Sequence, residues 1–91
     1  MANQRHQLTR EDLAQAIREI TEKTDYRLKQ KGHGVMASNH EILGIIVDEV
    51  QEYRDEVHAK SADDLKVEEL KDIAVAAIWG IASIRSGGVD W

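Results

Sequence analysis

Apolar residues recur along this 91-residue chain with the spacing of helix faces, and polar or glycine-containing stretches separate three such segments. This pattern predicts helices at about residues 9–31, 38–59 and 61–85. The chain has no proline and is rich in residues that favour helix. The sequence therefore predicts an all-α protein, a helical bundle of about three main helices within a single domain, residues 1–91.

Residues with a known role at helix ends mark the predicted boundaries. Thr9 has the side chain of an N-cap, and Ser38 and Glu41 have the spacing of a capping box. Ser61 is the expected start of the third helix, and the stretch Gly32–Gly34 is expected to end the first. These signals place all three helices between polar turns.

Each predicted helix has an apolar face. On the second helix the apolar residues cluster within about 80° when projected at about 100° per residue. The third helix is apolar all round beyond Asp72, which is typical of a fully buried element. Gly44 and Gly80, inside helices, suggest close helix–helix approach. The expected buried stripes are Leu13, Ala16, Ile17, Ile20 and Thr24 on the first helix, and Ile42, Ile46, Val50, Tyr53 and Val57 on the second.

Acidic residues crowd these apolar faces. The stretch Ile46–Val57 holds five acids, of which Glu49 projects inside the apolar arc and Glu52 borders it. Glu69 and Asp72 form a second pair three residues apart on the next helix. Residues at this spacing lie on adjoining turns of one face. Two consecutive helices thus each present an acid pair where the chain is expected to be covered.

Several buried carboxylates do not persist as bare anions at neutral pH. They can be protonated, can pair with Arg18 or Lys23 of the first helix, or can bind a divalent cation. Carboxylate oxygens are suitable ligands for Mg²⁺ or Mn²⁺. If they bind a cation, Asp72→Asn should remove the stabilisation that the ion provides while stabilising the metal-free form. A plain structural bundle with solvated acids remains the alternative.

Composition excludes other classes of function. The net charge of −5 argues against a nucleic-acid polymer as partner. The absence of cysteine excludes disulfides and fits a cytoplasmic protein. The longest apolar run, Ile73–Ile84, is too short to span a membrane, and the polar N-terminus shows no signal peptide. The four histidines lack the paired spacing of a zinc site.

The two acid pairs also resemble a known family signature. "DEVQE" and "EELKD", with sixteen residues between Glu52 and Glu69, resemble the E-E-x-x-E … E-x-x-D signature of MazG-like nucleotide pyrophosphohydrolases, the all-α NTP pyrophosphatase superfamily. "SNHE" upstream is similar to a Ser-x-His-Glu stretch in a phage- and mobile-element-associated branch. The resemblance covers about residues 32–82. Asp48 stands where the family usually has its first Glu, and its outward projection suggests a surface or supporting role.

The resemblance implies a fold and an activity. The implied assembly is a homodimer or tetramer, which agrees with the apolar third helix. The implied activity is Mg²⁺-dependent hydrolysis of a nucleoside triphosphate to a monophosphate and pyrophosphate. The implied metal ligands are Glu49, Glu52, Glu69 and Asp72, and Glu49 or Glu52 would also act as general base. The alternative is a binding module with this scaffold that has lost turnover.

Five further residues are candidates for substrate contact, each with an ordinary structural interpretation. Lys29 and Lys31 suit phosphate, but they are also common cations at a helix C-terminus. Trp79 can stack a base or fill a core, at a position where many family members are polar. His33 and His40 can contact substrate or simply be exposed.

Overall fold

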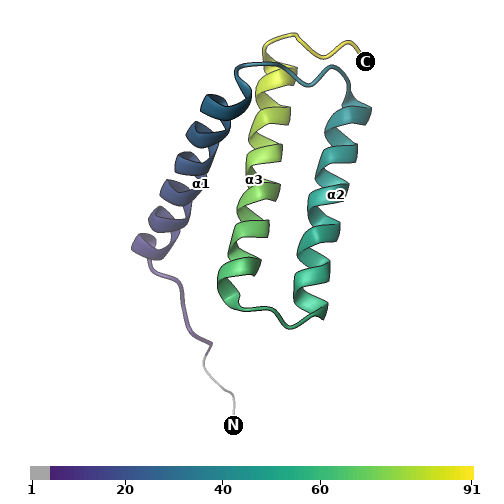
Figure 1. Ribbon diagram of the computed structural model, residues 1–91. Helices are drawn as coiled ribbons and strands as arrows, with labels where there is room; N and C mark the ends of the chain where they lie inside the picture. The colour runs from purple at the N-terminus through teal and green to yellow at the C-terminus, as the bar shows by residue number, and fades with distance from the viewer. Residues whose placement is uncertain (1–4) are drawn as a thin grey trace.

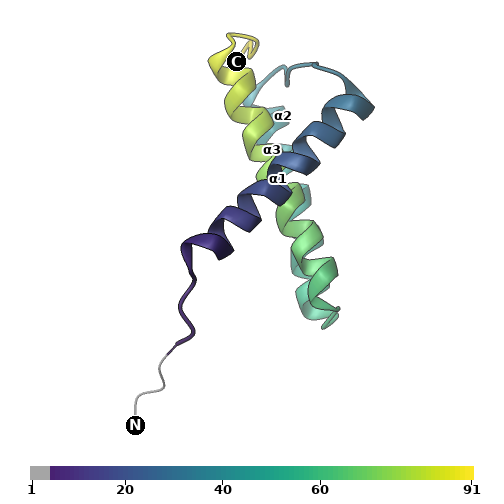
Figure 2. The same cartoon turned by 90° about the vertical axis from the view of Figure 1, so that its left-hand side faces the viewer.

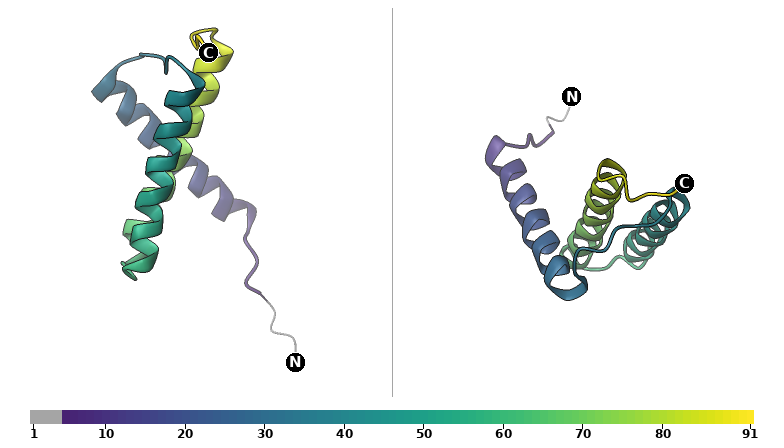
Figure 3. Two further views of the ribbon diagram at one scale, coloured as in Figure 1. Left: turned by 90° about the vertical axis from the view of Figure 1, so that its right-hand side faces the viewer. Right: turned by 90° about the horizontal axis from the view of Figure 1, so that it is seen from above.

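The computed structural model describes residues 5–91, so the first four residues of the polar N-terminal segment lie outside it. It contains α1 (Arg10–Lys31), α2 (Asn39–His58) and α3 (Asp63–Arg85) and, within that range, no strand, which confirms the all-α prediction. α2 and α3 lie side by side as an antiparallel hairpin, with α1 on the other side of α3 (Figure 1). Over the described residues, α1 packs against α3 and not against α2 (Figure 3).

α1 begins and ends as its sequence predicts. The Thr9 side chain accepts a hydrogen bond from the Asp12 backbone N–H at 3.0 Å, and the Asp12 carboxylate accepts one from the Thr9 N–H at 2.9 Å. This reciprocal capping box satisfies two N–H groups that the helix leaves without partners. Gly32 ends the helix with a φ of 76°, a conformation that glycine adopts without strain.

The other two helix starts differ in detail from prediction. Ser38 is the N-cap of α2, and its hydroxyl accepts from the Glu41 N–H at 3.1 Å. Glu41 does not return the bond to Ser38, because its carboxylate accepts from the N–H of Ala37 at 2.6 Å. Ser61 is not the start of α3. Ala62 holds the N-cap position without any side-chain hydrogen bond, so the first turn depends on its acids and on packing.

The hairpin is closed by a glycine contact. A Cβ placed on Gly80 of α3 would lie 2.9 Å from Cγ2 of Ile42 on α2, so the predicted close approach is confirmed there. Gly44 has open space around it, and the same prediction for that residue is wrong. Val75 and Ala76 are buried beside this contact, and buried Ser83 accepts a hydrogen bond from the Met36 N–H at 2.9 Å.

Large apolar surfaces remain uncovered in the single chain. Leu13 and Ile17 are 52% and 63% exposed, because α1 crosses α3 obliquely and its N-terminal half extends beyond the hairpin (Figure 2). Ile81 is 60% exposed, so α3 is not buried all round as predicted. Val50 and Val57 of α2 are exposed as well, so the stripes predicted for α1 and α2 are buried only in part. Within residues 5–91, no helix has the length and apolar character that crossing a membrane requires.

Candidate metal centre and pocket

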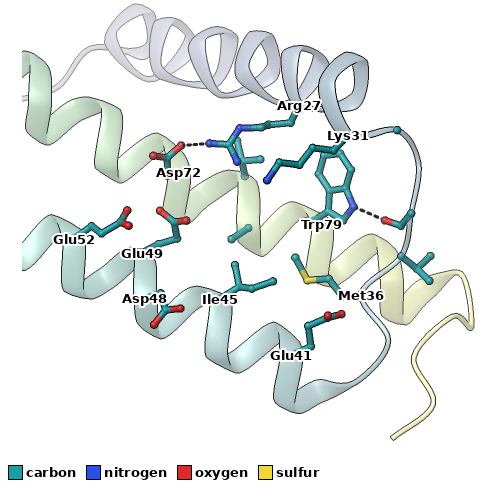
Figure 4. Close-up of a pocket in the computed structure, with 15 residues that line it drawn as sticks. Arg27, Lys31, Met36, Glu41, Ile45, Asp48, Glu49, Glu52, Asp72 and Trp79 are labelled. Atoms are coloured by element: carbon teal, nitrogen blue, oxygen red, sulfur yellow. Dashed lines mark hydrogen bonds and ion pairs between the residues drawn. The ribbon is translucent and has the colours of Figure 1, made fainter.

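Four carboxylates converge between α2 and α3. Glu49 and Glu52 project from α2, and Glu69 and Asp72 project from α3, with one oxygen of each lying within 4.8 Å of all the others. The antiparallel hairpin aligns the two i, i+3 pairs, and Figure 4 shows Glu49 facing Asp72 across the gap. The structure thus brings together the four residues that the sequence singles out.

The four acids differ in their exposure and bonding. Glu52 is exposed, whereas Glu49, Glu69 and Asp72 are half-buried. The Oε2 atoms of Glu49 and Glu69 are inaccessible to solvent and have no hydrogen-bond partner within the described residues. An unpaired buried acceptor is unfavourable, particularly when it carries charge. Two of the four carboxylates therefore present an oxygen that lacks a donor.

Burial and like charge both disfavour the ionised forms. The pKa of Glu49 is raised, first by burial and then by the nearby carboxylates of Glu52 and Asp72. The pKa of Glu69 is raised for the same reasons, burial first and Glu52 second. Among the ion pairs of the described residues, none involves Glu49, Glu52 or Glu69. These three acids form a site with uncompensated negative charge.

Asp72 is the exception, because α1 supplies it with two cations. Lys23 Nζ lies 2.7 Å and Arg27 Nη2 lies 2.9 Å from the same oxygen, Asp72 Oδ1. The structure thus confirms that Lys23 pairs with this cluster. The same expectation for Arg18 is wrong, because Arg18 bonds instead to Glu11 at 3.2 Å on its own helix.

Arg27 was missed from the sequence, although its spacing from Lys23 held a usable signal. The two residues are four apart and therefore share one face of α1. The pairing also changes the expected effect of Asp72→Asn. Because Asp72 is balanced by two cations, its neutralisation should destabilise the metal-free protein rather than stabilise it.

A pocket of about 460 Å³ opens beside the acids. Glu49, Glu52 and Asp72 line one end, and Trp79 lies toward the other (Figure 4). Lys31 belongs to its lining as well. The pocket therefore joins a negative end to a wall that carries positive charge. Arg27, Gly32, Gly34, Val35, Met36, Glu41, Ile45, Asp48, Val75 and Ala76 complete the lining.

The predicted substrate contacts divide into two groups. Lys31 and Trp79 line this pocket, and the Trp79 indole N–H donates to the Gly34 carbonyl at 2.9 Å, which fixes the ring against the loop after α1. Exposed Lys29 does not line it. Exposed His33 instead lines an adjacent, mainly apolar pocket of about 280 Å³.

The last two sequence candidates lie at the edges of the site. His40 is exposed, and its ring centroid lies 5.0 Å from that of Trp91, where the C-terminal tail returns to the start of α2. Asp48 is exposed, as its outward projection predicts, and it lies on the border of the main pocket. The structure thus separates His40 from the acid cluster and keeps Asp48 near it.

Comparison of the chain with protein-family models, with curated proteins and with solved structures found no match. A functional assignment therefore depends on the residues themselves and on their geometry.

Proposed function

We propose that this protein is a Mg²⁺-dependent nucleoside triphosphate pyrophosphohydrolase that converts (d)NTP to (d)NMP and pyrophosphate. The observation that carries the proposal is the convergence of Glu49, Glu52, Glu69 and Asp72, which includes two buried oxygens without partners. The resemblance of "DEVQE" and "EELKD" to the MazG-like signature supports this reaction class over other uses of a carboxylate cluster.

The four acids of the cluster are suitable ligands for a divalent cation. All four donors are carboxylates, the hard oxygen ligands that Mg²⁺ and Mn²⁺ prefer. A cation held by Glu49, Glu52, Glu69 and Asp72 would compensate the charge of Glu49 and Glu69, each of which has a buried oxygen without a hydrogen-bond partner. Burial is the first cause of the raised pKa of both groups, and the cation would offset the second, the charge of the neighbouring carboxylates. The donor set and the charge of the site therefore both favour Mg²⁺ or Mn²⁺.

The chain's own side chains suit the steps of phosphate-anhydride hydrolysis. A bound divalent cation offsets phosphate charge and makes the attacking water more acidic. Glu49 or Glu52 would accept the proton of that water, and the exposure of Glu52 supports such a role. Lys31, on the pocket wall, carries a positive charge that suits the remaining phosphates.

A binding module without turnover is the second candidate, and one specific observation favours it. Asp72 already has two cationic partners from α1, so one of the four ligands is engaged in holding the fold together. A site of this kind can bind a metal–nucleotide complex without aligning a water for attack. Measured binding together with absent hydrolysis distinguishes this candidate from the enzyme.

We further propose that the protein is a homo-oligomer, a dimer or a tetramer. Apolar residues that are exposed or half-buried recur at alternating spacings of three and four along α3, which is the spacing of a helix–helix seam. The stripe comprises Val67, Leu70, Ala74, Ala77, Ile81 and Ile84. A continuous apolar surface of this kind is uncommon on a monomer.

The oligomer is tested by sedimentation velocity on two matched variants. Ile81→Asp should lower the assembly mass, because it places a charge in the seam. Leu8→Asp should leave the mass unchanged, since Leu8 is similarly exposed but precedes α1. A wild-type protein that sediments as a monomer at micromolar concentration refutes the proposed assembly.

The enzyme is tested by pyrophosphate release from a panel of NTPs and dNTPs with Mg²⁺ or Mn²⁺. We expect release by the wild type and its loss in Glu49→Gln and Glu52→Gln. Release should be retained in Asp55→Asn, because Asp55 is an exposed acid of the same helix that lies outside both the cluster and the pocket. Nucleotide binding without release would favour the binding module. A protein that binds neither metal nor nucleotide is a structural bundle.

A further inference from the structure

Arg27 occupies the boundary between the acid cluster and the pocket. Its guanidinium bonds to Asp72 Oδ1 at 2.9 Å, and the same side chain lines the pocket beside Lys31 (Figure 4). Its side chain is 28% exposed, so it is accessible to a ligand in the pocket. A guanidinium carries five N–H donors, and the described contacts use Nη2 alone. Arg27 therefore has donors to spare at the pocket wall.

The bond between Arg27 and Asp72 is also partly redundant. Lys23 contacts the same oxygen at 2.7 Å and additionally reaches Glu68 at 3.1 Å. Lys23 thus links α1 to two acids of α3, and it would continue to do so if Arg27 left Asp72. Of the two cations, Arg27 is the one whose departure leaves both Asp72 and Glu68 paired with α1.

We infer that Arg27 is a phosphate-binding residue, which exchanges the Asp72 carboxylate for a polyphosphate oxygen when a divalent cation occupies the acid cluster. This inference builds on the proposed function and names a residue of that same site. A cation held by Asp72 neutralises the charge that holds Arg27, while the polyphosphate brings new anionic oxygens to the wall. A guanidinium matches phosphate with two parallel hydrogen bonds, a geometry that a lysine cannot provide.

The competing interpretation is that Arg27 only fastens α1 to α3. In that case its replacement would disturb the metal site and the polyphosphate site together, because both depend on where α1 lies. A phosphate-binding role predicts the opposite, a separation of the two affinities. Removal of Arg27 also removes a cation that competes for Asp72, so the affinity for Mg²⁺ alone should stay equal or increase.

Isothermal titration of the full chain measures both affinities. Mg²⁺ alone is titrated first, and then, at saturating Mg²⁺, inorganic tripolyphosphate and an α,β-methylene nucleoside triphosphate that resists cleavage. In Arg27→Gln we expect unchanged or tighter Mg²⁺ binding and at least about tenfold weaker binding of both polyphosphates. The polyphosphate affinity of Arg27→Lys should lie between those of wild type and Arg27→Gln, because lysine keeps the positive charge but cannot form the two parallel hydrogen bonds of a guanidinium.

Arg18→Gln is the matched control, since Arg18 lies on the same helix, pairs with an acid and does not line the pocket. It should bind all three ligands as the wild type does. Arg27→Lys carries the test if a thermal melt shows that Arg27→Gln does not fold.

Three results overturn the inference: unchanged polyphosphate affinity in Arg27→Gln, equal loss of Mg²⁺ and polyphosphate affinity, or a loss confined to the nucleotide. The last would place Arg27 at the base or sugar. In each case the wild type still binds Mg²⁺, so the proposed function stands. A wild type that binds no Mg²⁺ refutes the proposed function, and the inference fails with it.

Discussion

The α2–α3 hairpin and α1 are held in place by different forces. The hairpin is closed by apolar contact, with Gly80 against Ile42 and buried residues beside them. α1 is attached to α3 largely through charge, because Lys23 and Arg27 reach Asp72 and its apolar residues Leu13 and Ile17 remain exposed. The hairpin thus brings the acids together, and α1 balances the charge of one of them.

This difference shows how the candidate site is divided within the chain. The hairpin supplies all four carboxylates, and it leaves the charge of Glu49, Glu52 and Glu69 uncompensated. α1 supplies cations to Asp72 and also to the wall of the pocket. A change in the hairpin should therefore affect the stability of the fold, whereas a change in the charges should affect the position of α1 and the behaviour of the site.

The largest effect is expected from the glycine contact in the hairpin. Gly80→Val would force atoms into Ile42, and we expect it to lower the free energy of unfolding by about 2–3 kcal/mol through overpacking. Gly44→Ala is the matched control, because Gly44 is also helical but has open space around it. This substitution should raise the free energy of unfolding by about 0.5–1 kcal/mol, since alanine favours the helix more than glycine does. Urea denaturation measures both. Similar changes in the two variants would show that the hairpin is not closed by this contact.

A smaller and more local effect is expected in α1. Lys23→Met removes the ion pairs with Asp72 and Glu68, and we expect a loss of about 1–2 kcal/mol that is concentrated in α1. Hydrogen exchange should accelerate in α1 more than in the hairpin. Arg18→Met removes only an exposed pair and should change stability by less than about 1 kcal/mol. Uniform acceleration over all three helices would refute the separation of the two regions.

Neutralising Asp72 and neutralising Glu49 should change the free energy of unfolding in opposite directions. In metal-free protein, Asp72→Asn should lower the unfolding free energy by about 1 kcal/mol, because Lys23 and Arg27 lose their shared acceptor. Glu49→Gln should leave it unchanged or raise it by a few tenths of a kcal/mol, since it removes a charge surrounded by acids. Thermal melts in the presence of a chelator compare the two. Equal shifts would mean that α1 does not balance the charge of Asp72.

The smallest effect is a pH dependence. Glu49 and Glu69 have pKa values raised above 4.5 by burial, so they favour the fold below that pH, and this contribution is lost as pH rises through their folded pKa. Glu68 acts in the opposite direction, because hydrogen bonds from Lys71 and Lys23 lower its pKa. The useful measurement is therefore the difference between wild type and Glu49→Gln. Without metal, the free energy of unfolding of Glu49→Gln relative to wild type should increase above pH 4.5. A relative stability that decreases above this pH would refute the raised pKa of Glu49.

The sequence predicted most of the secondary structure and the grouping of the acids. Periodicity and caps are local, so Thr9 and Ser38 could be assigned from neighbouring residues. The convergence of Glu49 with Asp72 also followed from two helix faces that meet in an antiparallel hairpin. These features depend on spacing along one helix or on one turn between two.

The position of α1 could not be obtained in the same way. Its apolar stripe suggested burial of Leu13 and Ile17, but an oblique crossing is decided by long-range contacts that spacing within one helix does not encode. The same limit applies to Gly44, which the sequence predicted to approach another helix and which has open space around it. A partner chain over the exposed apolar stripes would reconcile the sequence pattern with the structure.

Titration calorimetry of Mg²⁺ into wild type, Glu49→Gln and Asp48→Asn decides whether the four carboxylates form a cation site. Saturable binding by wild type and Asp48→Asn, and its loss in Glu49→Gln, is the expected result. If wild type shows no saturable heat, or if Glu49→Gln binds Mg²⁺ as wild type does, the cluster is not a metal centre and the proposed hydrolase has no basis.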